Sequence, residues 1–260
     1  MRKWQKYFGV CGIDMIDRLN QLINNSNSIV FFGGAGVSTE SGIPDFRSKD
    51  GLYNTLDIQF EKYPPEYLLS RDCLKHNPEV FFEFYRQKMD CRNVEPNITH
   101  KMLAKMEKMG KLDLIITQNI DGLHQKAGST QVSEIHGTTL KNRCRKCWAN
   151  INDANFIFDN KDKIPKCPHC GGIVRPCVVL YGEELPWEEV NKASNAIAEA
   201  DLIIIGGTSL TVYPAAGLVA TWRKPNAKIV VINKEETNLD KQSDLVFRES
   251  IGKVFEQIKL

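Results

Sequence analysis

A glycine-rich segment at residues 33–47 is the feature of this 260-residue chain that most restricts its fold. It follows the apolar run 29–32, whose branched and aromatic side chains predict a buried strand. Gly33, Gly34 and Gly36 tolerate backbone conformations closed to other residues, and they leave backbone amides open to a phosphate group. A strand that ends in such a loop is typical of nucleotide-binding α/β proteins. The sequence therefore predicts a dinucleotide site here.

The spacing within this segment differs from the fingerprint of the dehydrogenases. When G-x-G-x-x-G is counted from Gly34, Thr39 stands where the third glycine should be. The acidic residue that binds the ribose about 20 residues further on is also missing, because Asp45 comes too early and follows Pro44 in a loop. The predicted site is therefore a dinucleotide site of another kind.

The composition is that of an ordinary globular protein, with 42% hydrophobic and 25% charged residues. A net charge of +2 gives no reason to expect nucleic acid as a partner. The apolar runs are far shorter than the roughly 20 residues needed to cross a bilayer, and residues 1–8 contain no apolar signal core. We expect a cytoplasmic protein without a membrane partner and, by default, a monomer.

Four of the eight cysteines predict a metal site. They form two C-x-x-C pairs separated by 19 residues, at Cys144, Cys147, Cys167 and Cys170. Paired knuckles at this distance favour a tetrahedral zinc site over a redox-active or incidental arrangement. Because four thiolates fill the coordination shell, the zinc should be structural.

Three further short apolar runs predict more strands of the same sheet, at residues 112–116, 201–205 and 228–232. Each ends in a polar or glycine-rich loop. Helical stretches are predicted at 13–25, 187–199 and 214–222. Buried strands that alternate with helices predict an α/β fold with a Rossmann-like, doubly wound parallel sheet. Ligands of such sheets bind at the carboxyl ends of the strands, so these loops should form the site.

Two segments interrupt this pattern and predict a smaller second domain. Residues 49–109 carry apolar stripes at helical spacing, which we interpret as packing, and residues 138–174 hold the cysteine pairs. We predict a small domain, a helical module plus a zinc ribbon, at 49–109 and 138–174. The remaining segments, 1–48, 110–137 and 175–260, are the predicted NAD-binding domain.

Polar residues at two strand ends are candidates for the chemistry. Gln118, Asn119 and Asp121 could bind a carboxamide and ribose hydroxyls, although an Asx-type turn explains them equally well. His136 follows the apolar segment 132–135 and is a candidate general base, with a purely structural histidine as the alternative.

Taken together, the motifs resemble those of the sirtuins, the NAD-dependent protein deacylases. The shared motifs are GAGVSTESGIPDFR at 34–47, TQNIDGLH at 117–124, HG at 136–137, the two C-x-x-C pairs, VVLYGE at 178–183, GTSL at 207–210 and IN-x-E at 232–235. The resemblance spans residues 28–247. It implies a Rossmann-like large domain, a small domain with a zinc ribbon, and a cleft that holds NAD and acyl-lysine.

The resemblance also implies a role for each motif. The residues implied to contact the NAD phosphates are Gly34, Ala35, Gly36, Ser38 and Thr39, and those implied to cover the nicotinamide ribose are Phe46 and Arg47. The residues implied to surround nicotinamide are Gln118, Ile120 and Asp121. The residues implied to hold the adenosine half are Gly207, Thr208, Ser209, Asn233 and Glu235. It implies His136 and Asn119 as catalytic residues, and Val179, Tyr181, Gly182 and Glu183 as substrate contacts. The substrate would bind as an added strand. Tyr181 stands where phenylalanine is common in the family.

The implied activity is lysine deacylation that consumes NAD and yields nicotinamide and O-acyl-ADP-ribose. His136 would accept a proton from the ribose hydroxyls. We expect acetyl to be the preferred acyl group, because Glu83, three residues before Arg86, replaces the tyrosine of the Tyr-x-x-Arg pair found in sirtuins that prefer acidic acyl groups. A longer-chain deacylase, a mono-ADP-ribosyltransferase and a non-catalytic zinc-ribbon binding module are the alternatives.

Overall fold

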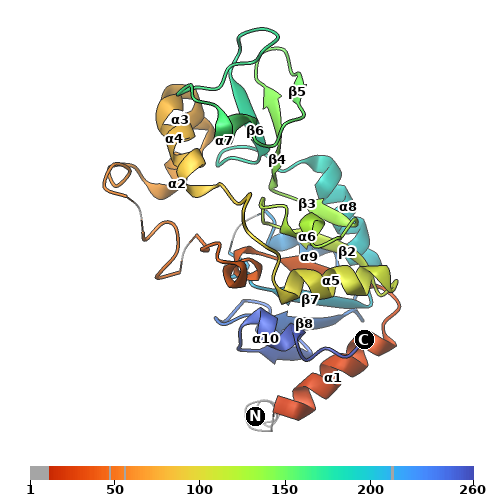
Figure 1. Ribbon diagram of the computed structural model, residues 1–260. Coiled ribbons are helices and arrows are strands. Elements are labelled where there is room, and N and C mark those ends of the chain that lie inside the picture. The colour runs from red at the N-terminus through yellow and green to blue at the C-terminus, as the bar shows by residue number, and fades with distance from the viewer. Residues whose placement is uncertain (1–11, 47, 56, 212–213) are drawn as a thin grey trace.

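A six-stranded parallel sheet forms the larger part of the molecule (Figure 1). The computed structural model describes residues 12–46, 48–55, 57–211 and 214–260. In spatial order the strands are β3 (Val132–Glu134), β2 (Leu112–Thr117), β1 (Ile29–Gly33), β7 (Leu202–Gly206), β8 (Lys228–Ile232) and β9 (Leu245–Phe247). The predicted parallel sheet and its four main strands are confirmed. Apolar side chains lie on both faces of these strands, as expected for a sheet that is covered on both sides.

Helices cover the two faces of this sheet, each with its own core. On one face, Phe31 packs with α1 (Gly12–Asn25), α5 (Ile98–Lys108) and α10 (Ile251–Phe255). On the other face, Phe32 packs with α8 (Trp187–Glu199) and α9 (Gly217–Trp222). Neighbouring residues of one strand therefore enter opposite cores, as the alternation of side chains along a strand requires. The doubly wound arrangement is confirmed.

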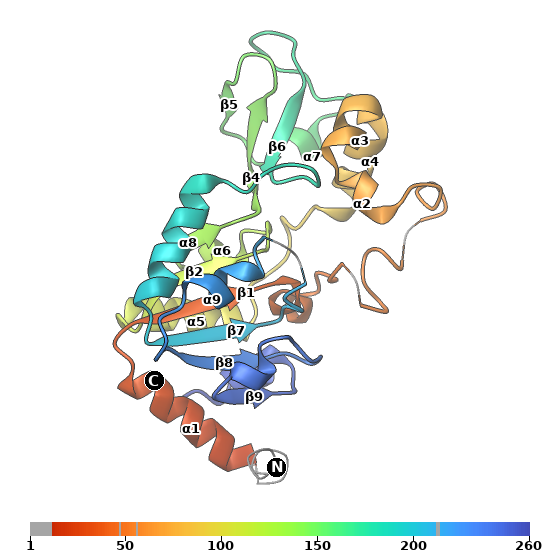
Figure 2. The same cartoon turned by 180° about the vertical axis from the view of Figure 1, so that it is seen from behind.

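A second, antiparallel sheet lies beside a group of helices at the other end of the molecule (Figures 1 and 2). Its strands are β4 (Gly137–Cys144), β5 (Asn150–Ile151) and β6 (Val174–Val178), and the helices are α2 (Pro65–Leu68), α3 (Arg71–His76), α4 (Pro78–Lys88) and α7 (Phe156–Asp159). Phe81, Phe84 and Tyr85 of α4 are fully buried against Ile157 and Leu180. The apolar stripe on α4 is thus packing, as predicted.

The segment 49–109 does not pack as one unit. Residues 49–55 and 57–64 form turns rather than helices. Leu103 and Met106 of α5 lie in the core of the large sheet with Phe31, whereas α4 packs in the other cluster. The predicted domain boundaries stay a prediction, but α5 belongs by its packing with the large sheet.

The remaining elements are short. They are α6 (Leu123–Lys126) and the 3-10 turns η1 (Ala35–Val37), η2 (Thr39–Ser41) and η3 (Asp240–Gln242). Among the described residues, no helix combines the length and apolar character needed to span a bilayer.

Candidate functional site

Two glycine-rich loops pack backbone to backbone at the carboxyl end of the large sheet. Gly33 and Gly206 end adjacent strands in register, so the loops that follow begin side by side. Gly34 N donates to Gly206 O at 3.2 Å, and Gly36 N donates to Gly207 O at 2.8 Å. A Cβ on Gly36 would lie 2.7 Å from Gly207 Cα, closer than real contacts allow. The glycines are therefore required for the contact between the loops.

A chain of side-chain hydrogen bonds joins the first loop to the loop after β2. Asn119 Nδ2 donates to Ser38 Oγ at 3.0 Å, and Ser38 Oγ donates to Asp121 Oδ2 at 2.7 Å. Leu123 N donates to the other carboxylate oxygen of Asp121 at 2.9 Å. Burial raises the pKa of Asp121, while these hydrogen bonds oppose the rise. Ser38 thus fixes the orientation of both Asn119 and Asp121.

His136 lies beside this chain in a defined tautomer. Its Nδ1 is 3.0 Å from the Gln118 carbonyl oxygen. Because a carbonyl can only accept, Nδ1 carries the proton and Nε2 is left as an acceptor. Burial lowers the pKa of His136, and the bond to Gln118 opposes this effect. The side chain of Gln118 in turn donates to Thr208 Oγ1 at 2.9 Å, which connects the loop after β7. The Nε2 of His136 is therefore the ring nitrogen that can accept a proton.

The remaining predicted NAD residues follow the same edge of the sheet. Gly207 N donates to Ile232 O at 3.1 Å, which places the loop after β8 next in order. There Asn233 Nδ2 donates to the Glu235 carbonyl at 3.0 Å, and the Glu235 side chain is exposed. In the first loop, Ala35 lies in η1, and Thr39 Oγ1 donates to Gly36 O. Ile120 borders the small-domain core, and Phe46 packs edge-to-face on Tyr53. Ser209 Oγ forms a hydrogen bond with Thr211 Oγ1. Arg47 lies outside the described residues.

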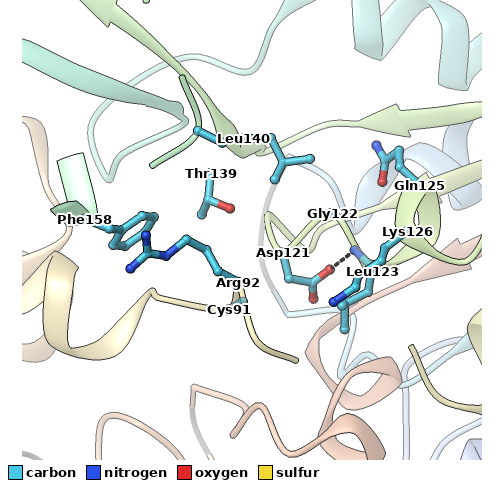
Figure 3. Close-up of a pocket in the computed structure, with 11 residues that line it drawn as sticks. Cys91, Arg92, Asp121, Gly122, Leu123, Gln125, Lys126, Thr139, Leu140 and Phe158 are labelled. Atoms are coloured by element: carbon cyan, nitrogen blue, oxygen red, sulfur yellow. Dashed lines mark hydrogen bonds between the residues drawn. The ribbon is translucent and has the colours of Figure 1, made fainter. Parts of the chain in front are cut away.

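A hollow of about 260 Å³ lies beside the Asp121 loop (Figure 3). Its walls come from Cys91 and Arg92, from the 121–126 segment, and from Leu140 and Phe158 near the small sheet. The Arg92 guanidinium lies over the Phe158 ring, 5.0 Å from its centre. His136 and the glycine loops do not line this hollow. It adjoins the candidate site through Asp121 alone.

The predicted substrate segment is tied into the structure on several sides. Val179 N donates to His136 O at 2.8 Å. Tyr181 N donates to Leu69 O at 3.0 Å, and Tyr181 O accepts from Arg71 N at 3.0 Å. Because both backbone groups of Tyr181 pair within the chain, a substrate strand would have to use other groups, such as those of Gly182.

The carboxylate of Glu183 stabilises the same segment through contacts within the chain. It forms an ion pair with Arg175, whose side chain is only 6% exposed, and it accepts from Leu180 N at 3.0 Å. Arg175 also donates to Val178 O at 2.6 Å. Sequence reasoning gave Glu183 a backbone contact with substrate and missed its side chain's partner, since the pairing across eight residues has no local signal.

The preference for a neutral acyl group that we infer from Glu83 stays a prediction. Glu83 is exposed on α4, while its neighbours Phe82 and Phe84 are fully buried in the core that borders Ile120. Arg86 donates to the carbonyls of Ile157, Asp162 and Lys163 and so points elsewhere.

The four predicted cysteines meet in space. Their sulfur atoms all lie within 4.8 Å of one another, with Cys144–Cys170 at 3.5 Å and Cys147–Cys167 at 3.8 Å. A tetrahedral zinc with Zn–S bonds of about 2.3 Å would hold its sulfurs ~3.8 Å apart. The amides of Lys146 and Cys147 point at Cys144 Sγ, which favours a thiolate there. The cluster fits a structural zinc ion.

Sequence reasoning missed a brace beneath the glycine loop. Asn97 Nδ2 donates to Val37 O at 2.8 Å and to Ser41 Oγ at 2.9 Å. The same side chain caps α5 together with His100. An Asn-x-x-His capping box departs from the usual Ser/Thr-x-x-Glu pattern, so it could not be recognised from the sequence.

Comparisons with known proteins agree with this geometry. A model of the Sir2 family matches residues 34–214. A protein of Clostridium perfringens named NAD-dependent protein deacetylase is 52% identical over 246 residues, which cover 94% of this chain and 98% of that protein. A protein of the same name from Clostridium acetobutylicum is 51% identical over 246 residues, with 95% and 98% covered.

The chain is also similar to solved structures of Sir2 proteins. One, described as Sir2 with a peptide and NAD+, is 33% identical, with a TM-score of 0.82 and 93% of this chain and 96% of that chain covered. Another, described as Sir2 bound to acetylated peptide, is 32% identical, with a TM-score of 0.81 and the same coverage.

Proposed function

Because the chain belongs to the Sir2 family, we infer that it is an NAD-dependent protein deacetylase. It consumes NAD, releases nicotinamide and transfers the acetyl group of a lysine side chain to ADP-ribose. The observation that carries this function is the meeting of three loops beside His136, joined by the hydrogen bonds of Ser38 and Gln118. Acetylated peptides, which bind the similar Sir2 structures, are the substrate class.

We propose the following roles for the residues at the sheet edge. The loop of residues 34–39 lies against the phosphates, supported by the absence of side chains at Gly34 and Gly36. The amides of these two glycines pair with Gly206 and Gly207, so other groups of the loop bind the phosphate oxygens. Asp121 accepts from the carboxamide nitrogen, supported by its orientation through Ser38. Residues 207–209, Asn233 and Glu235 hold the adenosine half, and Phe46 shields the ribose from water.

The acetyl oxygen of the substrate lysine bonds to the ribose carbon of NAD as the bond from that carbon to nicotinamide breaks. His136 Nε2 then accepts a proton from a ribose hydroxyl, whose oxygen attacks the former acetyl carbon, and water releases the free lysine and O-acetyl-ADP-ribose. The Gln118 carbonyl holds the imidazole in the tautomer that leaves Nε2 free of a proton. Asn119, oriented by its bond to Ser38, is proposed to position the ribose or the attacking water. Zinc on the four cysteines holds the small sheet and takes part in no step.

We further propose that the protein acts as a monomer in the cytoplasm, without nucleic acid. A reducing compartment is supported by the cysteine cluster, which can hold zinc only as thiolates. For the domains we propose that residues 49–97 and 138–174 form the small domain, and that α5 joins the NAD-binding domain. Size-exclusion chromatography with light scattering tests the monomer, and limited proteolysis tests the boundaries.

The function is tested with an acetyl-lysine peptide and NAD. We expect nicotinamide, deacetylated peptide and O-acetyl-ADP-ribose in equal amounts by mass spectrometry. A peptide that gains the mass of ADP-ribose would instead identify a mono-ADP-ribosyltransferase. Binding of NAD with no turnover of any acylated peptide would favour the non-catalytic binding module, and faster removal of long acyl chains would identify a longer-chain deacylase.

A further inference from the structure

One side of β4 and of the residue that follows it carries a row of positive side chains. Lys141 and Arg145 are exposed, and Arg143 between them is half-buried. They alternate with two buried residues, Asn142 and Cys144, so the three cations point away from the core. None of the three forms an ion pair with another residue in the described part of the chain. Their charges are therefore open to a partner.

The first cysteine pair adds an aromatic ring to this row. Trp148 is 67% exposed and has a φ of +62°, which residues other than glycine rarely adopt. The guanidinium of Arg143 lies over its ring, 5.4 Å from the centre. The turn after the cysteines thus holds a large apolar ring in solvent beside the cations. We call Lys141, Arg143, Arg145 and Trp148 the basic face.

The zinc site explains some of the positive charge in this region, but not the basic face. Four thiolates leave a zinc site with a net negative charge. The lysines next to the cysteines, Lys146 and Lys166, are exposed and can offset that charge. Lys141 and Arg143 lie on the strand before the first cysteine, so their charge stays available to a partner.

The basic face continues into the proposed substrate segment. Arg143 pairs in register with Arg175, and the side chain of Arg175 forms an ion pair with Glu183. Burial alone would raise the pKa of Glu183, but hydrogen bonds from Arg175 and Leu180 and the charges of Arg175 and Arg143 lower it. At about 3.3 Å per residue, the chain from Arg175 to Tyr181 spans at most roughly 20 Å. A peptide bound at Tyr181 can therefore reach the basic face within about six to eight residues.

We propose that the basic face binds an acidic segment of the substrate protein, about six to eight residues away from the acetyl-lysine. The proposal rests on the proposed function, because it extends the substrate segment assigned there. Carboxylates of the acidic segment pair with the three cations, and an apolar side chain among them packs on Trp148.

The charge of the whole chain favours this partner over nucleic acid. The chain carries a net charge of only +2, which is less than the three positive charges of the basic face, so the rest of the surface is net negative. A short acidic segment fits such an isolated face. A long polyanion would extend onto surface that repels it.

The test compares acetyl-lysine peptides that differ only far from the acetyl-lysine. One peptide carries three glutamates about seven residues away and the other carries three glutamines, and a second pair places these residues on the other side of the acetyl-lysine. On one side the glutamate peptide should have a roughly 3- to 30-fold lower KM with an unchanged kcat, since exposed ion pairs add to binding alone. The difference should shrink between about 0.1 M and about 1 M salt, because the screening length falls from about 10 Å to about 3 Å.

Variants of the exposed cations assign the effect to the basic face. The double variant Lys141→Gln, Arg145→Gln should reduce the KM difference to about twofold or less, and glutamate at both positions should reverse the preference. Lys161→Gln is the matched control, because Lys161 is exposed and follows α7, whose Phe156 packs with Cys144 on the buried side of β4. It should keep the full difference. The glutamine peptide should have the same KM in every variant, which shows that the zinc site is intact.

Equal KM values for glutamate and glutamine peptides on both sides, with normal turnover, would refute the basic-face proposal alone. A difference that persists in the double variant would also overturn it. A labelled oligothymidylate that binds the unmodified protein more tightly than the double variant, without any preference among the peptides, would assign the face to nucleic acid instead. Fluorescence anisotropy of labelled peptides separates the two proposals: tighter binding of the glutamate peptide without turnover of either peptide refutes the proposed function alone.

Discussion

A buried pair of histidines between α5 and α6 should make the stability of this protein depend on pH. His100 and His124 are almost completely buried, and their ring centres lie 4.8 Å apart. Burial lowers the pKa of His100 to about 4 and that of His124 to about 3, the latter with a further contribution from His100. Both rings are therefore neutral in the fold at pH 7.

The direction of the effect follows from proton uptake. In the unfolded chain both histidines have a pKa near 6.5, so below this pH the unfolded state binds protons that the folded state does not bind. The stabilisation is fully present above about pH 6.5 and is lost as the pH falls toward the folded values. Between pH 7 and pH 5 each histidine should lower the free energy of unfolding by about 2 kcal/mol, or ~4 kcal/mol for the pair. That is a large share of the 5–15 kcal/mol typical of a folded domain.

Urea unfolding of the full chain at pH 5, 6 and 7 measures this loss. His124→Leu is the informative variant, because neither ring nitrogen of His124 has a hydrogen-bond partner within the described part of the chain. The leucine leaves no polar group unpaired, and it should reduce the loss between pH 7 and pH 5 by about 2 kcal/mol. His76→Gln on an exposed face serves as the control for removing a histidine. An equal loss in His124→Leu and the unmodified protein would refute the reasoning.

Other predictions concern the site itself. His136→Ala should lower deacetylation by about 100-fold or more while NAD binding, measured by calorimetry, is retained; normal turnover would exclude it as the base. Because burial lowers the pKa of His136, activity should fall on the acid side only below the ordinary histidine value, as a kcat–pH profile would show. Ser38→Ala should raise the KM for NAD about tenfold, since Asn119 and Asp121 lose their common partner. Removal of zinc should unfold the small sheet, as measured by circular dichroism, and abolish activity until zinc is restored. Full activity without metal would contradict a structural role. Acetyl-peptide should be turned over faster than succinyl-peptide in a direct comparison of rates, because Glu83 stands in place of the tyrosine of the Tyr-x-x-Arg pair; the reverse order would reject this view.

The large sheet could be predicted because its strands are buried on both faces and so appear as continuous apolar runs. The strand β9 escaped prediction because it has only three residues, Leu245–Phe247. The antiparallel sheet escaped because β4 has exposed residues among its buried ones and no apolar run. The docking of α5 on the large sheet also had no local signal, since an apolar helix face does not specify which core it enters.

The residues of the site could be predicted from its motifs, but the bonds between them could not. Ser38 joins Asn119 and Asp121 across more than 80 residues of sequence. That contact exists because Gly33 and Thr117 end neighbouring strands in register, which brings the two following loops together. Register of this kind is a property of the assembled sheet, so the sequence could name the participants without giving their order.

The glycine-rich loop now has a second reason for its composition. The sequence explained Gly34 and Gly36 by the approach of phosphate to backbone amides, whereas the structure also packs Gly36 directly on Gly207. Gly207 has a φ of +59°, and a Cβ there would lie 2.4 Å from Val37 N. A substitution at either glycine should therefore lower stability and NAD affinity together. Weak NAD binding by such a variant supports the phosphate role only if the substitution costs more free energy of NAD binding than free energy of unfolding.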